Sequence, residues 1–225
     1  MGTSMAFYHV KNRGFDREEL QRIMTEASFS SAARDAEFDS IRQMFGEEVI
    51  QQYLRSMEQF SKAFRFDPSG GNAGGDPGAV IGYRPDAPWL PFFDADICEN
   101  YNASSRDAEL LSKAFGAPVL AFSIFDSDVL MLSYSDAERG VNHNYAKPNC
   151  EGVEEYDTEL FRAELPAFLL FLCPELTKEK LTEIWEGEEI FADDRMRKLC
   201  EVLGMVSLYE NKVPEGFEAI KANQA

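Results

Sequence analysis

Two pairs of aspartates have the residue type and spacing that a hard metal ion uses. Asp94 and Asp96 follow a short apolar stretch, and Asp126 and Asp128 lie between two longer apolar runs. Because side chains alternate along a strand, this spacing places both carboxylates of a pair on one face wherever the strand continues. Four converging carboxylates would suit Mg²⁺, Mn²⁺ or Ca²⁺, and such an ion can activate water. A carboxylate-metal-dependent hydrolase is therefore one function hypothesis.

The same four aspartates also fit an ordinary structural role. Asp and Ser favour turns because their side chains bond nearby backbone N–H groups. The chain has 40 acidic residues, so two Asp-x-Asp matches are unsurprising. We therefore favour a turn over a metal site for the tip at 126–128. We predict no bound metal or cofactor.

A histidine and a cysteine that are close in sequence offer a second kind of chemistry. His143 would act as the base and Cys150 as the nucleophile. Three glutamates follow Cys150, and negative charge disfavours a thiolate, while His143 falls in an alternating stretch typical of a half-exposed strand. Cys173 precedes Pro174 and a predicted helix start, but it ends an apolar run that predicts burial. We expect none of these residues to be catalytic.

Other catalytic motifs are scarce in this chain. It contains no Gly-x-Ser-x-Gly, no P-loop and no Gly-x-Gly-x-x-Gly. Its two histidines, His9 and His143, are too few for a histidine-rich metal site. The sequence therefore favours a protein that works by binding over an enzyme.

A segment near the C-terminus combines acidic and aromatic residues. A concentrated negative field steers a basic protein surface towards it, and an exposed aromatic ring supplies the apolar anchor that charge lacks. The competing interpretation is a solvated helical corner whose aromatic rings belong to the core. The predicted partner-binding residues are Glu183, Trp185, Glu186, Glu188, Glu189, Phe191, Asp193 and Asp194.

The net charge narrows the choice of partner. The chain has 22 basic and 40 acidic residues, which gives −18. The excess is −3 over residues 1–83, −5 over 84–149 and −10 over 150–225. A polyanion would be repelled, so we expect no nucleic acid and no membrane as partner. A basic protein fits, and so does an immunity or antitoxin-like role that neutralises a basic toxin.

Periodicity places these residues on an α+β fold. Strands are predicted at 5–11, 79–83, 89–94, 119–125 and 129–134, and helices between and after them. We expect one domain over 1–225 with a small mixed or antiparallel sheet and packed helices. A helical insertion near 28–66 and a flexible Gly/Pro loop at 67–78 interrupt it, and the part 157–225 is predicted to be mainly helical.

The hairpin 119–134 is predicted to be the spine of the sheet. Both alternate sets of side chains in its strands are rich in apolar residues, which indicates cover on both faces. We expect Phe122 and Leu130 to be buried on facing central strands.

Local signals predict where several helices begin and which side they bury. Asp16 and Glu19 form a capping box ahead of one helix. Asp193 is predicted to cap another, in which an apolar stripe ends at Gly204. The helix 105–115 is expected to bury Leu110, Leu111, Ala114 and Phe115.

Cysteine usage and hydropathy predict a cytoplasmic protein. The four cysteines contain no Cys-x-x-Cys pair, so we expect free thiols and no disulfide. The N-terminal residues lack the pattern of a secretory signal, and the longest apolar run, 166–173, is too short to span a bilayer.

Three stretches carry a resemblance to other proteins: "MGTSMAFYHVK", "VLAFSIFDSDVLMLSY" and "FADDRMRKLCEVLGM". With its first strand and its Phe-Asp-Ser-Asp hairpin, the chain resembles a loose group of uncharacterised bacterial proteins with no known activity. The resemblance covers under a fifth of the chain and implies a bacterial cytosolic protein. It assigns no role to any residue.

Overall fold

The computed structural model describes residues 5–26, 79–93, 104–125, 129–148, 164–187, 191–206 and 213–221. The predicted insertion at 28–66 and the loop at 67–78 lie outside these ranges. Strands within them are β1 (Met5–Lys11), β2 (Val80–Tyr83), β3 (Trp89–Phe93), β4 (Val119–Phe125), β5 (Val129–Asp136), β6 (Val141–Pro148) and β7 (Glu218–Lys221). Helices within them are α1 (Arg17–Glu26), α5 (Ser104–Phe115), α6 (Leu169–Leu172), α7 (Lys178–Trp185) and α8 (Ala192–Val202).

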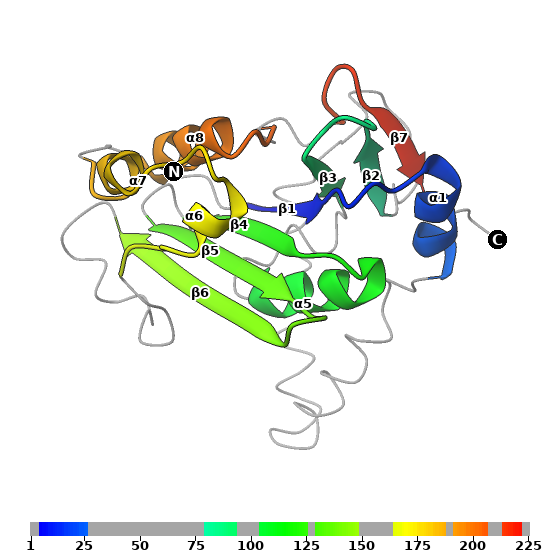
Figure 1. Ribbon diagram of the computed structural model, residues 1–225, viewed down its shortest axis with the longest axis horizontal. Coiled ribbons are helices and arrows are strands. Elements are labelled where there is room, and N and C mark those ends of the chain that lie inside the picture. The colour runs from blue at the N-terminus through cyan, green and yellow to red at the C-terminus, as the bar shows by residue number, and fades with distance from the viewer. Residues whose placement is uncertain are drawn as a thin grey trace, which may run out of the picture.

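All seven strands belong to one antiparallel sheet in the order β6-β5-β4-β1-β3-β2-β7 (Figure 1). The predicted α+β class with an antiparallel sheet is thus confirmed. The strand β1 is central, because it pairs with β4 on one side and β3 on the other. The predicted spine, the hairpin β4–β5, lies instead in one half of the sheet. Both of its strands are nevertheless interior, as predicted, because β4 pairs with β1 and β5 while β5 pairs with β4 and β6. Helices α5 and α8 both contact them.

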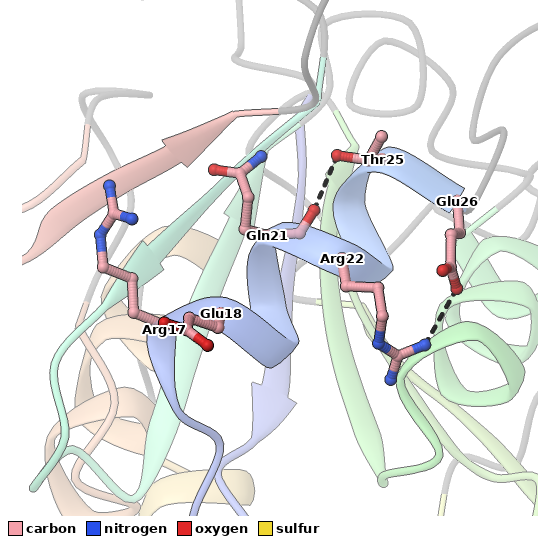
Figure 2. A pocket seen from close by; sticks show the side chains of 6 residues that line it. All are labelled: Arg17, Glu18, Gln21, Arg22, Thr25 and Glu26. Atoms are coloured by element: carbon pink, nitrogen blue, oxygen red, sulfur yellow. Dashed lines mark hydrogen bonds and ion pairs between the residues drawn. The ribbon is translucent and has the colours of Figure 1, made fainter.

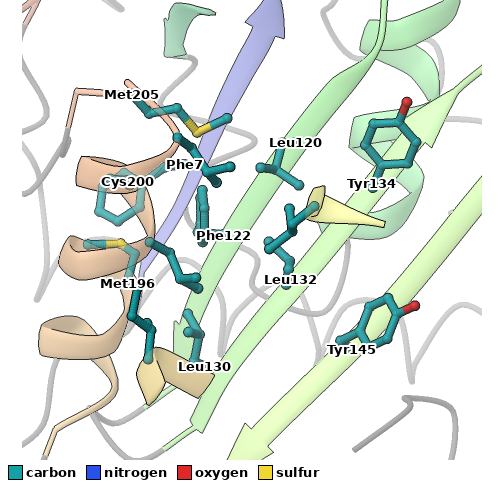
Figure 3. Close-up of a cluster of buried hydrophobic side chains, with 14 of the residues drawn as sticks. Phe7, Leu120, Phe122, Leu130, Leu132, Tyr134, Tyr145, Met196, Cys200 and Met205 are labelled. Carbon is teal, nitrogen blue, oxygen red and sulfur yellow. The ribbon is translucent and has the colours of Figure 1, made fainter. Parts of the chain in front are cut away.

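Two apolar clusters cover the two faces of the sheet. One cluster joins the strands to α6, α7 and α8, and Figure 3 shows its side chains between the sheet and those helices. The other cluster joins the strands to α1 and α5. Along β4, Leu120 and Phe122 enter the first cluster, whereas Val119 and Ala121 enter the second. Phe122 and Leu130 are fully buried, as predicted.

Helix ends follow the local sequence in part. The backbone N–H of Glu19 donates to the carboxylate of Asp16 at 2.7 Å, which confirms that arm of the capping box. Gly204 has a positive φ of 64° just after α8, as a helix-ending glycine should. The cap predicted at Asp193 is wrong, because α8 begins at Ala192 and Phe191 is its N-cap residue.

One further expectation is corrected. Leu110 was expected on the buried side of α5 but is 39% exposed. Ala108, Leu111 and Phe115 supply the buried side, because they share one face at helical spacing. The part 157–225 was predicted to be mainly helical, and its described elements are α6, α7, α8 and the strand β7, which pairs with β2 at the edge of the sheet. Only Ile220 of β7 is buried, so the strand has almost no apolar alternation to detect.

The apolar run 166–173 forms only the short helix α6. Leu169 is fully buried there, but Phe171 points outward and is 88% exposed. No helix in the described part of the chain is long and apolar enough to cross a membrane.

Candidate functional site

The two aspartate pairs, Asp94 with Asp96 and Asp126 with Asp128, lie outside the described residues. The strands that precede them end at Phe93 and Phe125. Both strands run antiparallel to β1. The last residues of both strands therefore lie near the first residues of β1, at the same end of the sheet. Among the residues that are described, no group of three or more His, Cys, Asp or Glu side chains is placed to hold a metal ion.

His143 takes part in an aromatic cluster at the edge of the sheet. It lies half-buried on β6, stacks on Phe168 with ring centroids 5.5 Å apart, and faces Tyr134 across the strand pair. The expectation of a half-exposed strand histidine is confirmed. Burial raises the pKa of Tyr134 to about 12. The proposed partner of His143, Cys150, lies outside the described residues.

Cys173 and Cys200 are free thiols. The Sγ of Cys173 donates to the carbonyl oxygen of Val202 at 3.3 Å, which joins the end of α6 to the end of α8. Burial raises the pKa of the Cys200 thiol to about 12, so this sulfur stays protonated and unreactive. Cys98 and Cys150 belong to the ranges that the structure leaves undescribed.

Three acidic residues in the described part of the acidic segment form ion pairs with nearby cations. Glu183 lies 3.1 Å from Lys180, Glu186 lies 2.5 Å from Lys147, and Asp194 lies 3.0 Å from Arg197. Such exposed pairs contribute little to stability, but each one offsets the negative charge that would attract a partner. Asp193 is half-buried, and Glu188 and Glu189 are outside the described ranges.

The two aromatic residues of that segment have different surroundings. Trp185 is completely buried in the cluster beneath α7 and α8, so its predicted role as an exposed anchor is wrong. Its position at the end of α7 faces the sheet, where an indole ring buries a large apolar area. Phe191, at the N-cap of α8, is 49% exposed and remains a candidate anchor.

Phe171 is an exposed aromatic residue that the sequence interpretation missed. It belongs to the layer of α6, α7 and α8, as Phe191 does, and the two are the exposed large aromatic side chains of the described residues. Helical periodicity in the sequence could have predicted that Phe171 is not part of the core. Counting from the buried Leu169, positions i+3 and i+4 are Leu172 and Cys173, whereas Phe171 is at i+2 and points away.

A shallow hollow of about 360 Å³ runs along the outer face of α1 (Figure 2). Its lining side chains already interact locally: Arg22 pairs with Glu26 at 2.9 Å, and the Thr25 hydroxyl donates to the Gln21 carbonyl oxygen at 2.8 Å. These groups are exposed, and water screens their charges. Its lining residues include no histidine, cysteine or serine.

Most of the net negative charge of the sequence belongs to residues outside the described ranges. The described residues include 19 acidic and 15 basic ones, whereas the rest of the sequence has 21 acidic and 7 basic residues. The described part of the molecule is therefore only mildly acidic.

Comparison of the chain with protein-family models, curated proteins and solved structures finds no match.

Proposed function

We propose that this protein is a non-catalytic protein-binding module that takes a basic protein as its partner through the layer of α6, α7 and α8. The observation that carries the proposal is the exposure of Phe171 and Phe191 on that one layer. Aromatic rings contribute strongly to protein interfaces when a partner removes them from water. A partner that covers these two rings would remove them from water.

The charge supports a basic partner. At −18 the chain repels polyanions and attracts cationic surfaces, and the attraction raises the rate of encounter. We place the protein in the bacterial cytosol on the strength of its sequence resemblance. An immunity or antitoxin-like role, in which the module neutralises a basic toxin, fits this chemistry.

The proposal is tested by capturing partners from bacterial lysate on the immobilised full chain. We expect captured proteins to be basic and to be lost as ionic strength rises from about 0.1 M to about 1 M, because the Debye length falls from about 10 Å to about 3 Å. One variant neutralises the acidic segment through Glu186→Gln, Glu188→Gln, Glu189→Gln, Asp193→Asn and Asp194→Asn. A control neutralises acids elsewhere, through Glu18→Gln, Glu138→Gln and Glu215→Gln. The control should leave capture unchanged, and capture that is indifferent both to salt and to neutralisation of the acidic segment would contradict the proposal.

A carboxylate-metal-dependent hydrolase is the second candidate function. The pairing of the strands favours it, because β3 and β4 finish at the same end of the sheet. Asp94 and Asp126 are the next residues after these two strands in the sequence. A specific ion would raise the melting temperature by mass action. Addition of Mg²⁺, Mn²⁺ or Ca²⁺ should then stabilise the wild type but not the variant with Asp94→Asn and Asp126→Asn. An equal response of both proteins would remove this candidate.

A further inference from the structure

The two outer strands of the sheet, β6 and β7, differ in how they are protected against further pairing. A strand at the edge of a sheet has a row of backbone N–H and C=O groups that can pair with another strand. Short strands and charged side chains are common means of preventing this. The strand β7 has both, because it contains only four residues, and Glu218 and Lys221 among them are charged and exposed.

The strand β6, outermost on the other side of the sheet (Figure 1), lacks such protection over most of its length. It has eight residues, and every one pairs with β5 in unbroken register, without a bulge. Residues 141–146 include no acidic residue, lysine or arginine, and Lys147 is held 2.5 Å from Glu186. In the described part of the chain, only β5 is bonded to the backbone of β6. Alternate residues of β6 therefore direct their backbone groups away from the sheet.

The two faces of β6 have side chains of different character. His143 and Tyr145 lie on the face that α6 covers, and Phe168 stacks on both rings with centroids 5.5 Å apart. Asn142 and Asn144 lie on the other face, where the Asn142 amide donates to a carboxylate of α5. A strand that continues the sheet must thus place aromatic or apolar side chains on one face and polar side chains on the other.

A second copy of β6 meets this requirement. When two copies pair antiparallel about a two-fold axis perpendicular to the sheet, residues of the same face lie opposite each other. With the axis at Asn144, His143 lies opposite Tyr145 of the partner subunit, and Asn144 lies opposite its own copy. The paired side chains carry no acidic or basic pair of like sign. Because β7 is protected, the pairing uses one edge of each copy and closes as a dimer instead of growing into a fibre.

We propose that two copies of this chain associate through β6, pairing antiparallel into one continuous sheet. Self-association at β6 goes beyond the proposed function, since it uses a strand edge and not the rings of Phe171 and Phe191. A contact made mainly by one strand of each copy is small, so we expect a weak and reversible dimer. The charge of −18 on each copy opposes association, and salt screens it. The dimer should therefore strengthen with ionic strength, whereas capture of a basic protein should weaken.

Sedimentation velocity of the full chain over a wide range of concentration measures this association. We expect the variant with Asn142→Lys and Asn144→Lys to weaken the dimer about tenfold or more, because like charges meet across paired strands. The control with Thr182→Lys and Ala219→Lys makes the same change of charge at exposed positions on α7 and on the other edge, and it should associate as the wild type does. Circular dichroism checks that both variants are folded.

Hydrogen exchange gives a second measurement that needs no variant. Backbone amides of β6 that point away from β5 should exchange more slowly in concentrated than in dilute wild-type protein. A wild type that stays monomeric at every concentration would overturn the inference. A dimer that both variants weaken equally, or one that leaves the exchange of β6 unchanged, would place the contact elsewhere and overturn it as well. Salt-sensitive capture of basic proteins in either case would leave the proposed function standing.

Discussion

His9 is a buried histidine on the central strand β1. Its Nε2 donates to the carbonyl oxygen of Val206 at 2.9 Å, and its ring meets Phe122 edge-on with centroids 6.3 Å apart. Burial lowers its pKa to about 4, because the charged ring would lose its hydration. An unfolded histidine takes up a proton below about pH 6.5. Stability from neutral His9 is therefore complete above that pH and is lost as the pH falls towards 4.

A measurable pH dependence follows for this residue. Between about pH 7 and about pH 5.5 the wild type should lose about 1 kcal/mol more unfolding free energy than His9→Gln, which cannot titrate. Urea denaturation of both proteins at the two pH values gives the difference, and the window stays above the range in which carboxylates protonate. Equal losses would show that His9 is charged or solvated in the folded protein.

Individual residues were predictable from sequence only where one strong rule applied. Phe122 and Leu130 lie in apolar strands, and both are buried. The predictions for Trp185 and Phe171 depended on the kinds of residue beside them in the sequence. Such neighbours do not say which side of a helix faces the sheet. The acidic neighbours of Trp185 suggested a surface, and the apolar neighbours of Phe171 suggested a core, but the structure buries the first ring and exposes the second.

At the scale of elements, a buried arginine holds α7 and α8 together. Arg195 is 2% exposed; its Nη2 donates to the carbonyl oxygen of Gly187 at 2.7 Å and its Nε to that of Ile184 at 3.3 Å. These carbonyls lie at the end of α7, where a helix leaves its last acceptors unpaired. Arg195 thus supplies donors that the helix itself lacks.

Replacement of this arginine should loosen the helix pair. Arg195→Met keeps much of the apolar stem but leaves buried acceptors unpaired, so we expect a loss of about 2–4 kcal/mol of unfolding free energy. Arg197→Met, on the exposed side of the same helix, should change stability by less than about 1 kcal/mol. Denaturation midpoints of the two variants provide the comparison, and similar midpoints would refute the structural role of Arg195.

Elements were predictable in proportion to their length and apolar content. The range 5–11 was predicted and found as β1, and the hairpin strands were recognised from continuous apolar runs. The strand β7 was missed because four residues with one buried side chain give no period. Its place in the sheet is determined by pairing with β2, a contact between distant parts of the sequence that local patterns do not encode.

At the scale of the whole molecule, the sheet lies between two apolar clusters, and some of its strands contribute side chains to both. Both tryptophans, Trp89 and Trp185, belong to the cluster under α6, α7 and α8. Tryptophan fluorescence therefore reports on that side of the sheet, whereas circular dichroism reports on helices and strands of both sides. Since β1, β3 and β4 each contribute side chains to both clusters, loss of one face should remove support for the other.

Phe122→Ala tests this coupling, because Phe122 is fully buried where the sheet meets α8 (Figure 3). The cavity should cost about 3–5 kcal/mol, a large part of the stability of an ordinary domain. We expect fluorescence and circular dichroism to give coincident midpoints in the wild type, and both midpoints to fall together in the variant. If Phe122→Ala lowered only the fluorescence midpoint, the layer of α6, α7 and α8 would unfold separately from the sheet. The exposed rings of Phe171 and Phe191 would then stand on a layer that moves independently, and a partner would have to order that layer as it binds.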